Sequence, residues 1–249
     1  MASCGAGKVE NAIDNDVAQT SKQVLVEKPS EKLEYTSISF LGVGDNIVYA
    51  GTVRDAQSNS KSGERKYNFK PIYSNVADMI EKADVSFINQ ETLMCGEGYD
   101  FTYYPTFNGP QDMGHDIVEM GFDVVGIANN HMLDKGSAGL LKTIEFWDTK
   151  DVTLIGGYKN KADYNTVRIH EEQGIKIAFL AYAQDTNGIY PSKNYDVHIP
   201  YLGEADIKSQ VENAKSMSDI VMVSVHWGDE GSFKANDYQK KYAKVFADN

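Results

Sequence analysis

The sequence predicts an α/β fold, and three observations support that prediction. Short apolar runs alternate with segments of helical periodicity from Thr36 onward. Two of these runs, residues 122–128 and 220–225, are apolar at nearly every position, which is typical of strands covered on both faces. The 249 residues are 41% hydrophobic and 11% aromatic, which is enough to bury a sizeable core. We therefore expect strands and helices to share one core.

The first predicted elements extend from residue 38 to Pro110. Residues 38–44 predict a strand that ends in a glycine-rich turn. Residues 72–83 predict a helix, because their apolar side chains recur on one helical face, namely Ile72, Val76, Met79, Ile80 and Ala83. A strand over residues 85–88 follows, and then a long loop rich in glycine, tyrosine and proline.

The remaining elements continue the same alternation. They are a helix at 113–120, the strand at 122–128, a helix at 140–147, strands at 152–155, 166–169 and 175–180, a helix at 205–217, the strand at 220–225 and a helix at 238–246. Gly174 lies between two of these strands and predicts that they form a hairpin.

The composition excludes several classes of protein. The 24 Lys+Arg against 36 Asp+Glu give a formal net charge of −12. Nucleic-acid binding needs a basic face that displaces counterions from phosphates, so no nucleic-acid partner is expected. The same balance disfavours electrostatic docking on an anionic membrane. The two cysteines, Cys4 and Cys95, exclude a disulfide framework and a cysteine-rich zinc site.

The first 34 residues predict a flexible leader, because they are polar and the first aromatic residue is Tyr35. The segment Met1-Ala2-Ser3-Cys4-Gly5 resembles the end of a bacterial lipoprotein signal peptide, whose cysteine becomes lipidated. The apolar stretch that normally precedes such a cysteine is missing, so an ordinary N-terminus is the alternative. Residues 35–249 are predicted to form one large α/β domain.

Polar side chains follow four of the predicted strands at the point where each strand ends. The segments are Gly44-Asp45-Asn46, Asn89-Gln90-Glu91-Thr92, Asn129-Asn130-His131 and His226-Trp227-Gly228-Asp229-Glu230. Ligands of α/β proteins bind beyond the carboxyl ends of the strands. If the four strands are parallel neighbours, these segments converge on one edge of the sheet.

The side chains of these segments are of the types that bind divalent metal ions. Carboxylates, carboxamide oxygens and imidazoles suit a hard or borderline ion, and two such ions about 3.5–4 Å apart could clamp a phosphoryl group and activate water. Glycines before Asp45 and after Trp227 would let backbone approach a ligand closely. The plainer alternative is that Asp, Asn and His form turns and caps after strands. The tyrosines of residues 99–105 could line a cleft or pack within their own loop.

Taken together, these motifs resemble the bacterial capsule synthesis protein family CapA, also described as poly-gamma-glutamate capsule biosynthesis (the PGA_cap domain). The resemblance runs from about residue 37 to residue 249, with the motifs in family order. Its most specific parts are Asn129-Asn130-His131-x-x-Asp134-x-Gly136 and His226-Trp227-Gly228-x-Glu230. This family resembles the calcineurin-like metallophosphoesterases, which implies a layered α/β sandwich with mostly parallel or mixed central sheets.

The resemblance also implies a role for each matching residue. The implied metal ligands are Asp45, Glu91, Asn130 and His226, and the implied ions are Mn, Fe or Zn. His131 would be the catalytic general acid. The implied substrate-binding residues are Asn89, Asn129, Trp227 and Glu230.

Two features depart from the phosphoesterase pattern. The histidine usually found two residues after the first aspartate is replaced here by Ile47. The closing Gly-His-x-His ligands have no counterpart, and the related His-Pro-His element of CapA-like proteins would lie shortly beyond Asn249. We therefore expect the domain to be truncated at its C-terminal end.

Three functions are compatible with these motifs. The first is a capsule or poly-gamma-glutamate biosynthesis protein with a metal-dependent hydrolase-like site, held as a lipoprotein through Cys4 on the extracellular face of the bacterial membrane. The second is a non-catalytic component that binds polymer or assembles the capsule machinery, and the third is a generic metallophosphoesterase. The expected partners are an anionic capsular polymer or its precursor and other capsule-machinery proteins, although the charge of −12 counts against a polyanion unless the cleft is positive or metal-filled.

Overall fold

Seven strands form two sheets in the part of the chain that the computed structural model describes, residues 35–249. The first sheet has the order β1-β2-β3-β4 and is parallel throughout, and the second has the order β5-β6-β7 and is mixed. The strands are β1 (Phe40–Asn46), β2 (Val85–Gln90), β3 (Val124–Gly126), β4 (Thr153–Ile155), β5 (Arg168–Glu172), β6 (Ile175–Ala183) and β7 (Ile220–His226). The predicted α/β class with parallel and mixed sheets is confirmed. The predicted leader and Cys4 lie outside the described residues.

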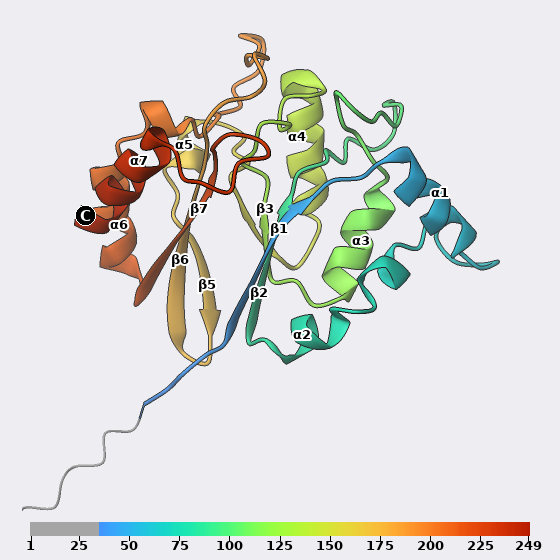
Figure 1. Cartoon of the computed structure of the whole chain (residues 1–249), viewed down its shortest axis with the longest axis horizontal. Coiled ribbons are helices and arrows are strands. Elements are labelled where there is room, and N and C mark those ends of the chain that lie inside the picture. The colour runs from blue at the N-terminus through green and yellow to red at the C-terminus, as the bar shows by residue number, and fades with distance from the viewer. Residues whose placement is uncertain (1–34) are drawn as a thin grey trace, which may run out of the picture. The chain divides into compact units, whose positions relative to one another are not determined.

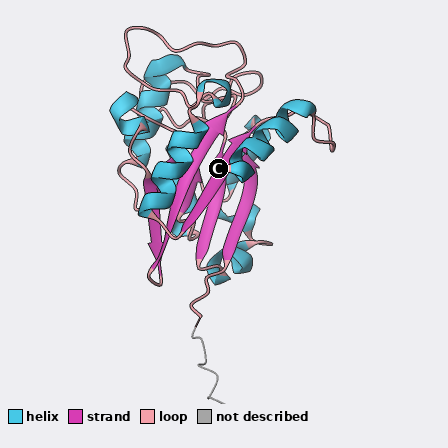
Figure 2. Cartoon of the chain, turned by 90° about the vertical axis from the view of Figure 1, so that its left-hand side faces the viewer, coloured by secondary structure: helices cyan, strands magenta, loops and turns pink. Residues whose placement is uncertain are grey.

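Helices cover the outer faces of both sheets, which gives four layers (Figures 1 and 2). The helices are α1 (Ala50–Ser58), η1 (Lys70–Tyr73), α2 (Ala77–Lys82), α3 (Gln111–Glu119), α4 (Gly136–Trp147), α5 (Lys161–Tyr164), η2 (Leu202–Glu204), α6 (Ile207–Met217) and α7 (Asp237–Asp248). Helices α1 to α4 contribute to the core on the outer side of the first sheet, whereas α6 and α7 pack on the second sheet. None of the described helices has the length and apolar character needed to cross a bilayer.

The alternation of side chains along the strands explains why the two sheets stack. In β6, Ile177, Phe179 and Ala181 point into the core between the sheets, while Leu180 and Tyr182 point toward α6 and α7. Strand β3 divides in the same way, with Val124 on the inter-sheet side. Both central strands are therefore apolar on both faces because both faces are covered.

Strand β7 does not follow the prediction for a strand covered on both faces. All of its residues from Val221 to His226 are half-buried, and Ile220 is exposed. The reason is its position, since among the described strands β7 pairs only with β6. The apolar run therefore predicted the strand correctly, but the prediction that both of its faces are buried was wrong.

The helix predicted over residues 72–83 is also wrong as a single element. The chain forms the short helix η1, with Pro71 in its first turn, and then the separate helix α2. Of the apolar face predicted for this helix, Ile80 is fully buried, whereas Met79 and Ile72 are exposed. Helix α1 was not predicted, although its Val53 and Ala56 join the core.

The hairpin predicted around Gly174 is confirmed. Strands β5 and β6 pair antiparallel, and Glu172 faces Ile175 across a two-residue turn. Both turn residues, Gln173 at φ 50° and Gly174 at φ 81°, have positive φ. This is the backbone that a tight hairpin needs, because its twist matches the twist of the strands.

Candidate metal centre

The carboxyl ends of strands from both sheets meet at one place. Asp45 lies at the end of β1, where the register between β1 and β2 shifts between Val43 and Asp45. Glu91 follows β2 directly, and His226 ends β7 in the second sheet. Ligand-type atoms of these three residues all lie within 4.8 Å of one another. The sequence placed all four polar segments on one sheet edge, whereas the site lies where two sheets end together.

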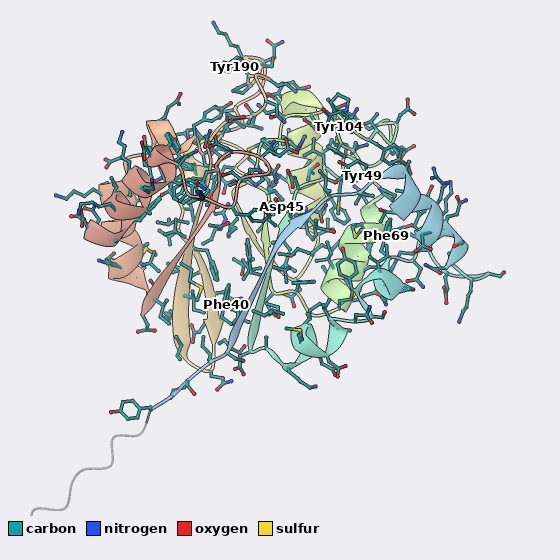
Figure 3. All side chains as sticks on the ribbon, in the orientation of Figure 1. Phe40, Asp45, Tyr49, Phe69, Tyr104 and Tyr190 are labelled. Atoms are coloured by element: carbon teal, nitrogen blue, oxygen red, sulfur yellow. The ribbon has the colours of Figure 1, made fainter. Side chains whose placement is uncertain are left out.

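The distances within this cluster place His226 between the two carboxylates. Its Nδ1 lies 3.5 Å from Oδ1 of Asp45, and its Nε2 lies 3.8 Å from Oε1 of Glu91. Figure 3 shows Asp45 near the end of β1 opposite to Phe40, which marks the start of the same strand. The cluster therefore sits at the edge where ligands of α/β proteins bind.

The pKa values in the cluster shift in the directions that this geometry requires. Burial, and next the charge of Asp45, raise the pKa of Glu91. Contact with His226 lowers the pKa of Asp45, against the opposing effect of burial. Burial acts to lower the pKa of His226, but contact with Asp45 and the charge of Glu91 outweigh it and raise that pKa. The protonation states of Asp45, Glu91 and His226 therefore depend on one another in this partly buried cluster.

The cluster has atoms free to bind a cation. Glu91 is only 6% exposed, yet its closest basic neighbours among the described residues are the Nε2 atoms of His131 and His226, both 3.8 Å from Oε1. These distances are too long for hydrogen bonds. Oδ1 of Asn130 is buried without a hydrogen-bond partner, while its Nδ2 donates to Oδ1 of Asn187 at 3.2 Å. Oxygen and nitrogen donors in this state fit a divalent metal ion.

His131 is fixed on both sides of its ring. Its Nδ1 lies 2.8 Å from Oδ2 of Asp134, and Phe107 packs edge-on against the imidazole at 4.7 Å between ring centres. Its backbone N–H donates to Oδ1 of Asn129 at 3.1 Å. With Nδ1 held by Asp134, Nε2 is the ring nitrogen that faces Glu91 and the cavity.

Asn89 and Asn129, predicted to bind substrate, lie beneath the cluster. Asn89 donates from Nδ2 to Oδ1 of Asp45 at 2.7 Å, and Asn129 donates from Nδ2 to the backbone oxygen of Gln90 at 3.2 Å. Both are buried, and neither lines the cavity over the cluster. Since Asn129 also accepts the bond from His131, the two carboxamides position the site residues from below.

A cavity of about 860 Å³ opens above the cluster. Its lining residues include Asp45, Glu91, Asn130, His131, His226, Trp227 and Glu230, which places seven of the nine predicted site residues in one cavity wall. Tyr104 and Pro105 of the tyrosine-rich loop also line it, whereas the side chain of Tyr103 packs against the main core. The loop thus lines the cavity, as one alternative expected, while Tyr103 packs on the main core and not within the loop alone.

Several cavity residues were given no role from the sequence, although Asp134 belongs to the family motif. Asp134 lies three residues after His131, and this spacing was a usable signal for a paired acid. Asp185 and Asn187 carried no such signal, because the chain segment that holds them follows β6 as an irregular loop. Asn187 adopts φ 53°, a backbone conformation that non-glycine residues rarely take and that often marks functional sites.

The two glycines singled out beside the site differ. Gly228 has φ 103°, and a Cβ there would lie 2.6 Å from Nε2 of Gln239, so this position needs glycine. Its N–H donates to Oε1 of Gln184 at 3.0 Å. Gly44 has open space where a Cβ would be, and the structure gives no reason for glycine there.

Residues 39–249 match the sequence model of a family described as bacterial capsule synthesis protein PGA_cap. Among curated proteins, the chain is 28% identical over 141 residues to the capsule biosynthesis protein CapA of Bacillus anthracis and 28% identical over 143 residues to the PGA biosynthesis protein CapA of Bacillus subtilis (strain 168). Each alignment covers 53% of this chain, but 33% and 35% of the two relatives. The chain thus spans about a third of the length of these proteins.

Solved structures show more distant similarity. A putative 5'-nucleotidase from Staphylococcus aureus in complex with alpha-ketoglutarate aligns with a TM-score of 0.48 at 14% identity, over 85% of this chain and 43% of that one. A hypothetical protein from Thermus thermophilus aligns with a TM-score of 0.44 at 16% identity, over 85% of this chain and 64% of that one.

Proposed function

This chain belongs to the bacterial capsule synthesis protein family PGA_cap, and we propose that it acts in capsule production as a metal-dependent, phosphoesterase-like hydrolase. The substrate would be a capsular polymer, poly-gamma-glutamate among them, or a precursor of one. The observation that carries this proposal is the cluster of Asp45, Glu91 and His226 with its unpartnered, nearly buried carboxylate.

The residues that would hold the ion are Asp45, Glu91, Asn130 and His226. Their mixed oxygen and nitrogen donors are compatible with Mn, Fe or Zn. When bound, a divalent ion supplies Lewis-acid polarisation of a substrate oxygen and lowers the pKa of water. Without the metal ion, the carboxylates of Asp45 and Glu91 would repel each other across His226. This repulsion favours the metal-bound form of the site.

The remaining site residues would bind and orient the substrate and move a proton. His131 would donate a proton from Nε2 to the leaving group, because that nitrogen faces the cavity. Asp134 would hold the imidazole by its opposite nitrogen and stabilise the protonated ring. Trp227 and Glu230, which line the cavity farther along the same wall, would contact the substrate.

The test is metal analysis together with turnover. Purified protein should bind Mn²⁺ or Zn²⁺ and hydrolyse a generic phosphate ester, and both properties should disappear in Asp45→Asn and in Glu91→Gln. Glu81→Gln, which removes an exposed acid from α2, is the control and should retain both. Failure of the wild-type protein to bind any divalent ion would refute the metal centre.

A non-catalytic role in binding polymer or assembling the capsule machinery is the second candidate. It is favoured by Ile47, which lines the cavity where phosphoesterases usually carry a metal-binding histidine. Complementation of capsule production separates the two roles. If His131→Ala restores as much polymer as wild type while still binding metal, the protein acts without catalysis.

We also propose that the protein is held at the extracellular face of the bacterial membrane through a lipid on Cys4, with residues 1–34 as the tether. The support is the sequence around Cys4 alone. Mass spectrometry of the protein from its native host should find an acylated cysteine in the membrane fraction. An unmodified N-terminus in the cytosolic fraction would refute the tether.

A further inference from the structure

The cavity above the proposed metal centre is strongly acidic. Six carboxylates line it, those of Asp45, Glu91, Asp134, Asp185, Asp229 and Glu230. Its described lining contains no lysine or arginine, and its only basic side chains are His131 and His226. Even with both histidines protonated, one divalent ion would leave part of this negative charge uncompensated. A chain of carboxylates or phosphates would therefore meet repulsion beyond the metal centre.

Two of the buried acids in this cavity have oxygen atoms without partners. Glu91 is only 6% exposed, and no histidine nitrogen lies closer than 3.8 Å to its carboxylate. Oδ1 of Asp134 is buried and makes no hydrogen bond in the described structure, although its Oδ2 binds His131 and the N–H of Phe107. Such groups are costly unless a ligand satisfies them, and they point to a ligand at the floor of the cavity.

The outer part of the cavity combines acids with aromatic faces. Asp229 and Glu230 are exposed, and neither forms an ion pair within the part of the chain that the structure describes. Trp227 stands two residues before Asp229, and Tyr104 and Tyr49, at 77% and 45% exposure, are further aromatic residues of the lining. Figure 3 shows Tyr49 and Tyr104 toward the same end of the molecule as Asp45.

Aromatic faces beside carboxylates are the surroundings that bind organic cations. The negative face of an aromatic ring attracts an ammonium group within about 6 Å, and a carboxylate adds a charge-assisted hydrogen bond. A neutral hydroxyl group could also donate a hydrogen bond to these acids, but only a cation compensates their negative charge and is attracted by the ring faces as well. The combination therefore selects among the possible substrates by charge.

We infer that the substrate carries a cationic ammonium group next to the bond that is hydrolysed, and that Asp229 and Glu230 with Trp227 and Tyr104 bind it. This inference rests on the proposed hydrolase function and adds a substrate class to it. It also means that an extended polyanion does not run through this cavity. If such a polymer is the substrate, only an end or a precursor with a free amine enters.

Three non-hydrolysable phosphonates of matched length test the inference. They are 2-aminoethylphosphonate, propylphosphonate and 3-phosphonopropionate, whose tails end in an ammonium, a methyl and a carboxylate group. Their dissociation constants for the Mn²⁺-loaded full chain are measured by isothermal titration calorimetry. We expect the ammonium compound to bind about tenfold more tightly than the propyl compound and the carboxylate compound to bind most weakly.

Charge-neutralising variants assign this preference to the cavity. Asp229→Asn with Glu230→Gln should reduce the tenfold preference for the ammonium compound over the propyl compound to about twofold. Glu81→Gln with Glu171→Gln changes the net charge equally at exposed positions outside the cavity and should keep the preference.

The outcomes separate this inference from the function on which it rests. Equal affinities for the three phosphonates, or a preference that survives neutralisation of Asp229 and Glu230, would overturn the inference and leave the metal centre standing. If no phosphonate binds to protein that holds Mn²⁺, the phosphoesterase-like function fails and the inference fails with it.

Discussion

Oδ2 of Asp134 lies 2.8 Å from Nδ1 of His131 and also accepts the backbone N–H of Phe107 at 2.6 Å. One oxygen thus ties the imidazole to the loop whose Phe107 ring packs against that imidazole. The loop that carries Phe107 and the turn after β3 both hold the ring of His131, so its orientation does not depend on a ligand. This fixed orientation makes the site testable by small changes around His131.

Replacement Asp134→Asn should lower kcat about 100-fold while metal affinity changes less than threefold. Asparagine keeps the shape but not the charge that stabilises a protonated His131, and Asp134 is not among the proposed ligands. Asp112→Asn is a matched control, because Asp112 also accepts a backbone N–H, that of Tyr67, at 3.0 Å but lies outside the cavity. Full activity of Asp134→Asn would show that His131 needs no paired acid.

Replacement Asn187→Gly should weaken metal binding about tenfold. Glycine keeps the positive φ of position 187 but removes the side-chain oxygen that accepts Nδ2 of Asn130 and so aims Oδ1 of Asn130. Asn187→Ala should lose the same bond and add backbone strain. Calorimetric titration with Mn²⁺ measures both, and an affinity equal to wild type in Asn187→Gly would exclude this orienting role.

The metal-free protein should lose stability as the pH rises from 5 to 8. The pKa of Glu91 is raised in the fold above its ordinary value of 4.5. Its contribution to the free energy of unfolding therefore falls as the pH rises from 4.5 to the raised pKa. The pKa of His226 is also raised, so its contribution is complete below 6.5 and is lost as the pH passes the raised value. The lowered pKa of Asp45 acts only below 3.8, outside this range.

Thermal unfolding in EDTA measures this slope. Glu91→Gln should make it shallower, because Glu91 no longer contributes to it and the lowered pKa values of His115 and His198 act in the opposite direction. A saturating concentration of Mn²⁺ should raise the melting temperature more at pH 8 than at pH 5, since protons compete with the ion at low pH. A metal-free protein that becomes more stable toward pH 8 would contradict the charge arrangement of the cluster.

Replacement Asp116→Ala should destabilise the fold by about 2–4 kcal/mol. Asp116 is 1% exposed, binds the guanidinium of Arg65 and accepts the N–H of buried Phe69 at 2.6 Å. Glu119→Ala is the matched control, because Glu119 binds the same Arg65 with a side chain that is 42% exposed. It should cost less than about 1 kcal/mol. Urea unfolding measures the free energy of unfolding of both variants. An equal loss of stability in the two would refute the prediction that buried Asp116 contributes more than exposed Glu119.

The sequence by itself determined the class of the fold and the chemistry of the site. Alternation of apolar residues predicts strands and helices, because side-chain periodicity is a local property of the backbone. The ligand-type residues Asp45, Glu91 and His226 could be named because they follow strands, and strand ends are where such folds bind ligands. The family motifs added His131 and the residues around it.

Only the tertiary structure decided which elements share a sheet and which groups reach the cavity. Periodicity shows that a face is apolar but not what covers it, so β7 was expected to be buried and the segment at 72–83 was expected to be one helix. The tertiary structure also placed Asn89 and Asn129 against Asp45 and His131, which no local pattern specifies. The acidic, aromatic cavity is likewise built from loops distant in sequence, and no local pattern encodes such a meeting.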